Sequence, residues 1–109
     1  MISATEFNKT VEALFDQIVE TIDESEAADD VELNQGVLEM TFLDASGVKS
    51  KIIINRHAPT QEIWVAAKSG GYHFRWADGV WLDTRSAEPL SDAISRVVFE
   101  QTGQRVSFD

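Results

Sequence analysis

Six short strand-like segments lie between two amphipathic helical segments, and this order is the strongest constraint on the fold. The expected strands are residues 31–33, 38–42, 48–55, 63–66, 72–76 and 80–82. Brief turn signals separate them, among them Asn34-Gln35-Gly36, Gly70-Gly71 and Asp78-Gly79. Strands joined by such short turns indicate an antiparallel meander.

The two flanking helices each present one apolar face. The first is predicted from the Ser3/Glu6 capping box to about residue 23 or 24. Its apolar side chains fall on one arc of the helix surface: Phe7, Val11, Leu14, Phe15, Ile18 and Ile22. The second helix is predicted to begin near Pro89 and to end at Gly103. We therefore expect an α+β fold in which both helices pack on one face of a single antiparallel β-sheet.

The bulk composition narrows the possible functions. A chain of 109 residues is expected to form a single domain, residues 1–109. The absence of cysteine excludes disulfides and thiolate catalysis. No apolar run reaches the ~20 residues of a membrane span, and no basic patch suits nucleic acid. We see no secretion or transit signal, so a cytoplasmic location is predicted.

The negative charge is concentrated at the N-terminal end. Ten of the 19 acidic residues, but only one of the nine basic residues, lie within residues 1–32. At 100° per residue, the helix acids point away from the apolar arc, and the acids that follow extend them as one surface. We name this surface the acidic ridge; its members are Glu12, Asp16, Glu20, Asp23, Glu24, Glu26, Asp29, Asp30 and Glu32.

Two interpretations of the acidic ridge are open. It can be a solvated helix face that keeps the chain soluble, or it can bind cations, because carboxylate oxygens suit iron, manganese, calcium and magnesium. The ridge is open rather than convergent, so metal binding is expected to be weak, multi-site and poorly selective. The sequence contains no 2-His-1-carboxylate triad and no Glu-x-x-His di-iron motif.

Trp64 and the two histidines are the other candidates. Trp64 alternates with Ile63 and Val65, so it faces solvent if the helices cover the Ile63/Val65 face, and it lies in the core if they cover the other. An exposed tryptophan on a sheet is a candidate partner anchor. His57, in a polar turn before Pro59, and His73, in a strand, are expected to be ordinary surface histidines. We find no catalytic constellation.

The centre of the chain is similar to a known family. The run from Ile54 to Ala66, with its Asn-Arg, Pro and Trp, followed by Lys68-Ser69-Gly70-Gly71-Tyr72-His73-Phe74, resembles the core signature of the frataxins, in particular of their bacterial branch. The acidic first helix, the segment from Asn34 to Leu38 and the ending Val106-Ser107-Phe108 match as well. The resemblance extends over essentially the whole chain.

The resemblance implies a two-helix sandwich on an antiparallel sheet, iron binding by carboxylates, and binding to the cysteine desulfurase that supplies sulfur for iron–sulfur clusters. Together with Asp16 of the ridge, the iron-linked acids are predicted to be Glu20, Asp23, Glu24, Asp29, Asp30 and Glu32. The predicted partner contacts are Glu20, Asp23, Glu24, Asn55 and Trp64. Val19 departs from the family pattern, because close relatives often carry an acid there.

The expected function is that of a non-enzymatic, iron-binding protein that regulates or supplies iron to the desulfurase and its scaffold protein. Iron, as Fe²⁺ or Fe³⁺, is expected to be weakly and exchangeably bound, with no organic cofactor. The alternatives are a ferroxidase or iron-storage protein, and an acidic adaptor with incidental metal binding. A monomer is expected, with iron-dependent oligomers left open.

Overall fold

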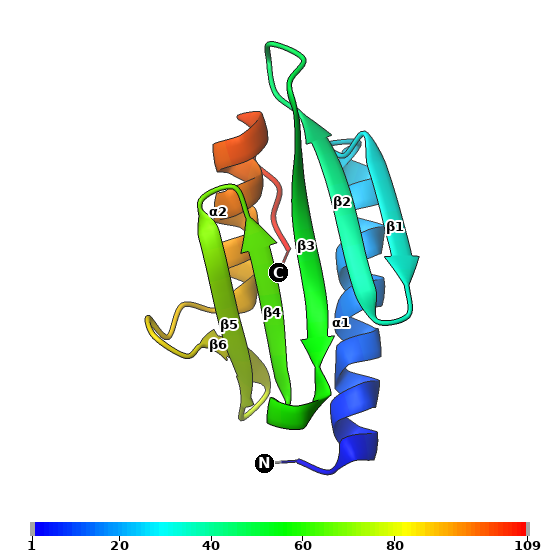
Figure 1. Cartoon of the computed structure of the whole chain (residues 1–109), viewed down its shortest axis with the longest axis vertical. Helices are drawn as coiled ribbons and strands as arrows, with labels where there is room; N and C mark the ends of the chain where they lie inside the picture. The colour runs from blue at the N-terminus through cyan, green and yellow to red at the C-terminus, as the bar shows by residue number, and fades with distance from the viewer. Residues whose placement is uncertain (1, 109) are drawn as a thin grey trace.

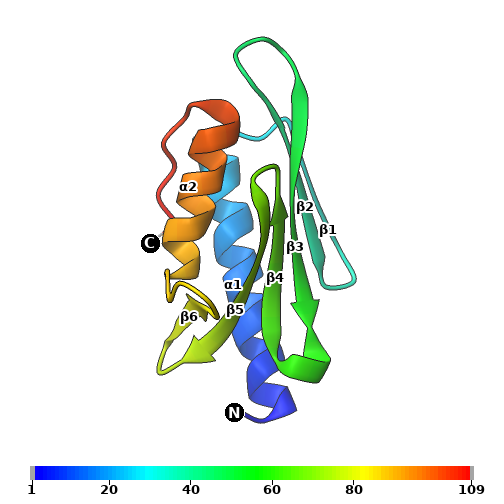
Figure 2. The same cartoon turned by 60° about the vertical axis from the view of Figure 1, so that its left-hand side comes forward.

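Two helices and six strands make up the computed structural model, which describes residues 2–108. The helices are α1 (Ala4–Ser25) and α2 (Leu90–Thr102), and a short 3₁₀ turn, η1 (Ala58–Thr60), follows the third strand. The strands are β1 (Asp30–Asn34), β2 (Val37–Leu43), β3 (Lys49–His57), β4 (Glu62–Ala67), β5 (Gly70–Ala77) and β6 (Val80–Asp83). Both helices lie behind the sheet in Figure 1, and the turned view shows two layers (Figure 2), which confirms the predicted architecture.

The sheet is a meander in which each strand pairs antiparallel with the next, in the order β1 to β6. Two of its hairpins use two-residue turns in which both central residues have positive φ: Gln35 (51°) with Gly36 (81°), and Asp78 (47°) with Gly79 (93°). These angles are those of type I′ turns, whose twist matches that of the flanking strands. Each turn therefore sets the register of its own hairpin.

The core lies between the helices and one face of the sheet. Helix α1 buries the apolar residues predicted for it, except that Leu14 is only partly buried. Alternate strand residues meet them, including Leu38, Met40 and Phe42 of β2, which are all fully buried. Because side chains alternate along a strand, the residues between them face away from the helices and form an open sheet face.

The helix ends follow the sequence signals. The Ser3 hydroxyl oxygen accepts a hydrogen bond from the backbone N–H of Glu6 at 3.1 Å, which caps α1. Gly103 ends α2 in the left-handed conformation, with φ 78°. Pro89 is the N-cap of α2 rather than a residue of its first turn. In the described part of the chain, neither helix is long and apolar enough to cross a membrane.

Two local predictions were wrong. Gly70 and Gly71 do not form the hairpin turn but are the first residues of β5, because the two residues Lys68 and Ser69 suffice to reverse the chain. Gly70 has φ 147°, which other residues rarely adopt. His57 does not lie in a polar turn either, since β3 continues to His57 and pairs it with Glu62.

Candidate functional site: an acidic ridge and a three-ring stack

The acidic ridge begins on the outer face of α1. Its five helix members (Glu12, Asp16, Glu20, Asp23 and Glu24) are all exposed, as their positions on the helix predict. Neighbours three or four residues apart on a helix lie about 5–6 Å apart, and like charges there cost a few tenths of a kcal/mol per pair. A shallow depression between α1 and β1 is lined by ridge acids together with Val19, Val31 and Leu33. Val19 thus contributes an apolar side chain among the carboxylates.

The ridge then passes around the edge of the sheet. Val31 packs against the core on the helix side, so Asp30 and Glu32 belong to the alternate, open face. Glu32 stands directly opposite Glu39 of β2, and Glu39 in turn pairs with Lys51 at 3.4 Å. The carboxylates predicted as metal ligands are therefore spread over two faces of one edge rather than gathered around one point.

None of the ridge carboxylates lies within 4.0 Å of a basic group in residues 2–108. Over the same residues, no group of three or more histidine, aspartate or glutamate side chains has the geometry to hold a metal ion. The ridge is thus a surface of uncompensated negative charge that can attract cations or a basic protein. It offers hard oxygen donors but no enclosed metal centre.

A second candidate surface lies on the open sheet face. The indole of Trp64 is half-buried between the imidazoles of His57 and His73. The ring centroids are 3.9 Å apart on the His57 side and 4.4 Å on the His73 side, with interplanar angles of 10° and 8°. We call these three residues the three-ring stack. The strand register accounts for the His73 side, because Trp64 of β4 pairs directly with His73 of β5. On the other side Asn55 of β3 is opposite Trp64, and His57, two residues further along β3, stacks on the indole diagonally.

Glu62 lies beside the stack and is only 5% exposed. Its Oε1 accepts a hydrogen bond from Trp64 Nε1 at 2.8 Å, and its Oε2 accepts one from Arg75 Nε at 2.9 Å. Burial works against ionisation of Glu62, but hydrogen bonds from Trp64, Arg75 and Thr60 and the Arg75 charge outweigh it, so the pKa of Glu62 is lowered. Glu62 therefore stays charged while it holds the indole.

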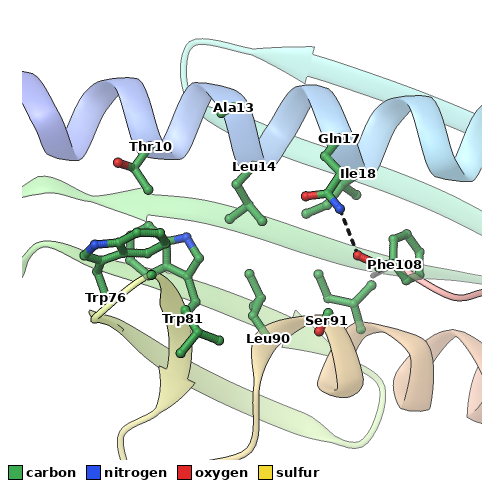
Figure 3. Close-up of a pocket in the computed structure, with 13 residues that line it drawn as sticks. Thr10, Ala13, Leu14, Gln17, Ile18, Trp76, Trp81, Leu90, Ser91 and Phe108 are labelled. Carbon is green, nitrogen blue, oxygen red and sulfur yellow. Dashed lines mark hydrogen bonds between the residues drawn. The ribbon is translucent and has the colours of Figure 1, made fainter.

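The helical side of the molecule carries an apolar groove between α1, α2 and the β5–β6 hairpin. Leu14, Trp76, Trp81 and Leu90 are among its lining residues (Figure 3). At one end, Gln17 Nε2 donates a hydrogen bond to the backbone oxygen of Phe108 at 3.0 Å, drawn as a dashed line in Figure 3, and so ties the C-terminal segment to α1. Among the described residues, 2–108, the lining contains no carboxylate or imidazole.

A family model described as a frataxin-like domain matches residues 1–104. The chain belongs to the frataxin family. The iron-sulfur cluster assembly protein CyaY of Tolumonas auensis is 40% identical over 103 residues, which cover 94% of this chain and 95% of the relative. The protein of the same name from Herminiimonas arsenicoxydans is 41% identical over 109 residues, which cover 96% of this chain and 95% of that relative.

Solved frataxin structures share the fold of this chain. The frataxin from Psychromonas ingrahamii superposes with a TM-score of 0.88 at 30% identity, and the match covers 99% of both chains. A trimeric frataxin from Saccharomyces cerevisiae, described as complexed with ferrous, gives a TM-score of 0.67 at 27% identity, with 91% of this chain and 87% of that chain covered. The frataxin resemblance seen in the sequence is thereby confirmed.

For this frataxin, the structure brings some predicted site residues together and separates others. The ridge acids share one edge, and Asn55 pairs with Trp64. Trp64 lies on the open face, since Ile63 and Val65 are buried, but its ring faces are covered rather than free. The two histidines, expected to be ordinary surface residues, form the walls of the stack. Sequence reasoning missed Glu62, although its i, i+2 spacing from Trp64 places both on one strand face.

Proposed function

We propose that this frataxin is a non-enzymatic, iron-binding protein of iron–sulfur cluster assembly. In this proposal it carries iron on the acidic ridge and uses the same ridge to dock on a cysteine desulfurase and its scaffold protein. The observation that carries the proposal is the uncompensated ridge in a chain of this family. The relatives named iron-sulfur cluster assembly protein support the role in cluster assembly, and the yeast frataxin described as complexed with ferrous supports iron binding.

The iron-binding half rests on the chemistry of the ridge. Carboxylate oxygens are hard donors that suit iron, and each bound cation relieves repulsion among neighbouring acids. Because the described carboxylates do not converge, each ion is held by few protein ligands and keeps much of its water. The iron is therefore weakly bound and exchangeable, which allows its transfer to another protein.

The docking half rests on charge and on the open sheet face. A ridge without internal ion pairs attracts a basic surface and speeds association with it. Trp64 and Asn55 offer a second contact on β4 and β3. Three strand spacings separate β1 from β4, about 14 Å at roughly 4.8 Å per strand, so one partner can cover both surfaces. Asp30 and Glu32 of β1 can then contact the same partner as Trp64 and Asn55, whereas the predicted contacts Glu20, Asp23 and Glu24 lie on the outer face of α1.

The two alternatives differ from the proposal in what they require. A ferroxidase or iron-storage protein would turn over Fe²⁺ to Fe³⁺, so repeated oxidation of excess Fe²⁺ by the purified chain would favour it. An acidic adaptor would bind its partner equally well without iron sites. We propose a monomer in the absence of iron, and sedimentation with and without Fe²⁺ measures whether iron drives assembly.

The test reverses charge on the ridge and, as a control, elsewhere. The ridge variant is Asp23→Lys with Glu24→Lys, and the control is Asp92→Lys with Glu100→Lys on α2. All four side chains are exposed helix residues, so both variants change the net charge equally and should leave the core intact. Iron titration and desulfurase affinity at two ionic strengths are measured for each.

The ridge variant is expected to bind less iron and to associate more slowly with the desulfurase, with a shallower salt dependence. The control should lose little of either property. Equal losses in both variants would mean that only net charge matters. Unchanged iron and partner binding in a folded ridge variant would refute the proposed role of the ridge.

A further inference from the structure

The indole of Trp64 is contacted on both ring faces and at its N–H, although it lies on the open face of the sheet. Two imidazoles lie parallel to its two faces, at 3.9 and 4.4 Å between ring centroids, and its only polar atom is hydrogen-bonded to Glu62 at 2.8 Å. The walls and the hydrogen bond come from different strands, since His57 ends β3 and His73 lies on β5. The indole is therefore confined on both faces and also at its N–H.

Glu62 is the group that orients this arrangement. Its carboxylate has one oxygen on Trp64 Nε1 and the other on Arg75 Nε, and His73 Nδ1 lies 3.8 Å from Oε1. The side chain of Glu62 is 7% exposed, whereas that of Arg75 is 66% exposed. Burying the Glu62 carboxylate costs desolvation free energy, and its hydrogen bonds offset this cost. Among residues 2–108, the polar partners of its side chain are Trp64 and His73 of the stack, Thr60 beside His57, and Arg75.

The opposite end of the stack is anchored as well. His57 Nδ1 lies 2.8 Å from the Thr60 hydroxyl of η1, so the turn that follows β3 holds the first imidazole. Rotating the indole would break its bond to Glu62 and move it out from between both imidazoles. A side chain with its rotamer already fixed loses less conformational entropy when a partner covers it.

We propose that Glu62 is a positioning residue for partner docking, which acts by fixing Trp64 between His57 and His73 in the conformation that the partner meets. This inference rests on the proposed function, in which Trp64 contacts the desulfurase. Glu62 itself, with its side chain almost wholly covered, acts through the indole rather than by touching the partner.

The test compares two substitutions of similar size at one position. Glu62→Met fills the same space but cannot accept the indole hydrogen bond, whereas Glu62→Gln keeps an oxygen that can. Each is made alone and together with Trp64→Ala. Glu100→Ala, which removes another arginine-paired carboxylate, on α2 and away from the three-ring stack, is the control. Desulfurase affinity is measured by calorimetry, and the indole N–H resonances are recorded by NMR. Loss of one resonance in Trp64→Ala assigns that of Trp64.

E62M is expected to lower the affinity about two- to tenfold. This range corresponds to the entropic cost of immobilising one freed side chain when the interface forms. It should also shift the Trp64 N–H resonance and speed its exchange with water. E62Q should retain most of the affinity, and E100A all of it. In the Trp64→Ala background, E62M should change the affinity less than about twofold, because no indole is left for Glu62 to position. Effects of the two substitutions that simply add would mean that the residues act independently.

Three results would overturn the inference, and they separate it from the proposed function. Full affinity in E62M while Trp64→Ala is weakened would leave docking by Trp64 intact and remove the role of Glu62. An equal loss with and without Trp64 would show that Glu62 acts through the fold in general. Full affinity in Trp64→Ala would refute docking by Trp64, and the positioning role would fall with it.

Discussion

At the scale of single residues, Glu62 combines burial, charge and a lowered pKa. A carboxyl whose pKa is lowered in the folded state stabilises the protein above its ordinary pKa, and this contribution is lost as the pH falls through the folded value. For Glu62, the stabilisation is complete at neutral pH and disappears in acid, below the ordinary value of 4.5. The bonds to Trp64 and Arg75 are the physical source of this dependence.

We predict that Glu62→Gln lowers the stability by about 1 kcal/mol at pH 7, because the charge-assisted part of two hydrogen bonds is lost. The difference between wild type and variant should shrink as the pH falls below 4.5 and vanish at lower pH. Denaturant unfolding at several pH values measures it. Glu12→Gln removes one exposed charge and serves as control, and a difference independent of pH would contradict this account of Glu62.

At the scale of elements, α1 carries both the ridge and much of the core, so its start affects both. Helices leave their first N–H groups without intrahelical partners, and the Ser3 hydroxyl satisfies that of Glu6. At the other end, Glu26 adopts φ 55° to end the helix, and the chain then turns into β1. The two faces of the ridge are thus joined by one short connection.

We predict that Ser3→Ala lowers the free energy of unfolding by about 1 kcal/mol through loss of this cap. For a domain of this size, that corresponds to a fall in melting temperature of about 4–8 °C. Ser3→Asp retains an acceptor at the same position and should leave the melting temperature near that of wild type or above it. Equal destabilisation by both variants would mean that Ser3 acts through something other than the cap.

At the scale of the whole molecule, the fold places most of the net charge of −10 along one edge. Like charges held at fixed positions repel more than they do in an unfolded chain, so the ridge opposes folding. The core must offset this cost, since no ridge acid pairs with a base in the part of the chain described. Cations that bind the folded state should therefore stabilise it by mass action.

We predict that divalent cations raise the melting temperature at concentrations far below those at which Na⁺ acts. A ligand at 100 times its Kd stabilises the fold by about 2.7 kcal/mol. Scanning calorimetry at low salt, with Mg²⁺, Ca²⁺ or anaerobic Fe²⁺, measures the shift. The Asp23→Lys, Glu24→Lys variant should respond less, and an unchanged wild-type melting temperature in millimolar Fe²⁺ would contradict cation binding by the ridge.

The sequence by itself determined which side chains share a face of each element and which face of each helix is buried, but it left open which face of β4 the helices cover. The helical spacing of Phe7, Val11 and Ile18 and the alternation of Ile63 with Trp64 both follow from fixed geometric periods, and the structure agrees with them. The same reasoning placed the acids of α1 in solvent. Turn positions were less certain, because Gly70 and Gly71 suit a tight turn and also the start of a strand.

Only the tertiary structure decided which side chains meet. Glu62, Trp64 and His73 lie on different positions of two strands, and their contact depends on the pairing of Trp64 with His73 rather than with a neighbouring residue. A shift of one residue in that register would turn one strand over and separate the rings. The two-residue turn at Lys68 and Ser69 sets this register, and the sequence favoured Gly70-Gly71 instead. The part of the ridge on α1 was therefore predictable from one element, whereas the three-ring stack required the pairing of three strands.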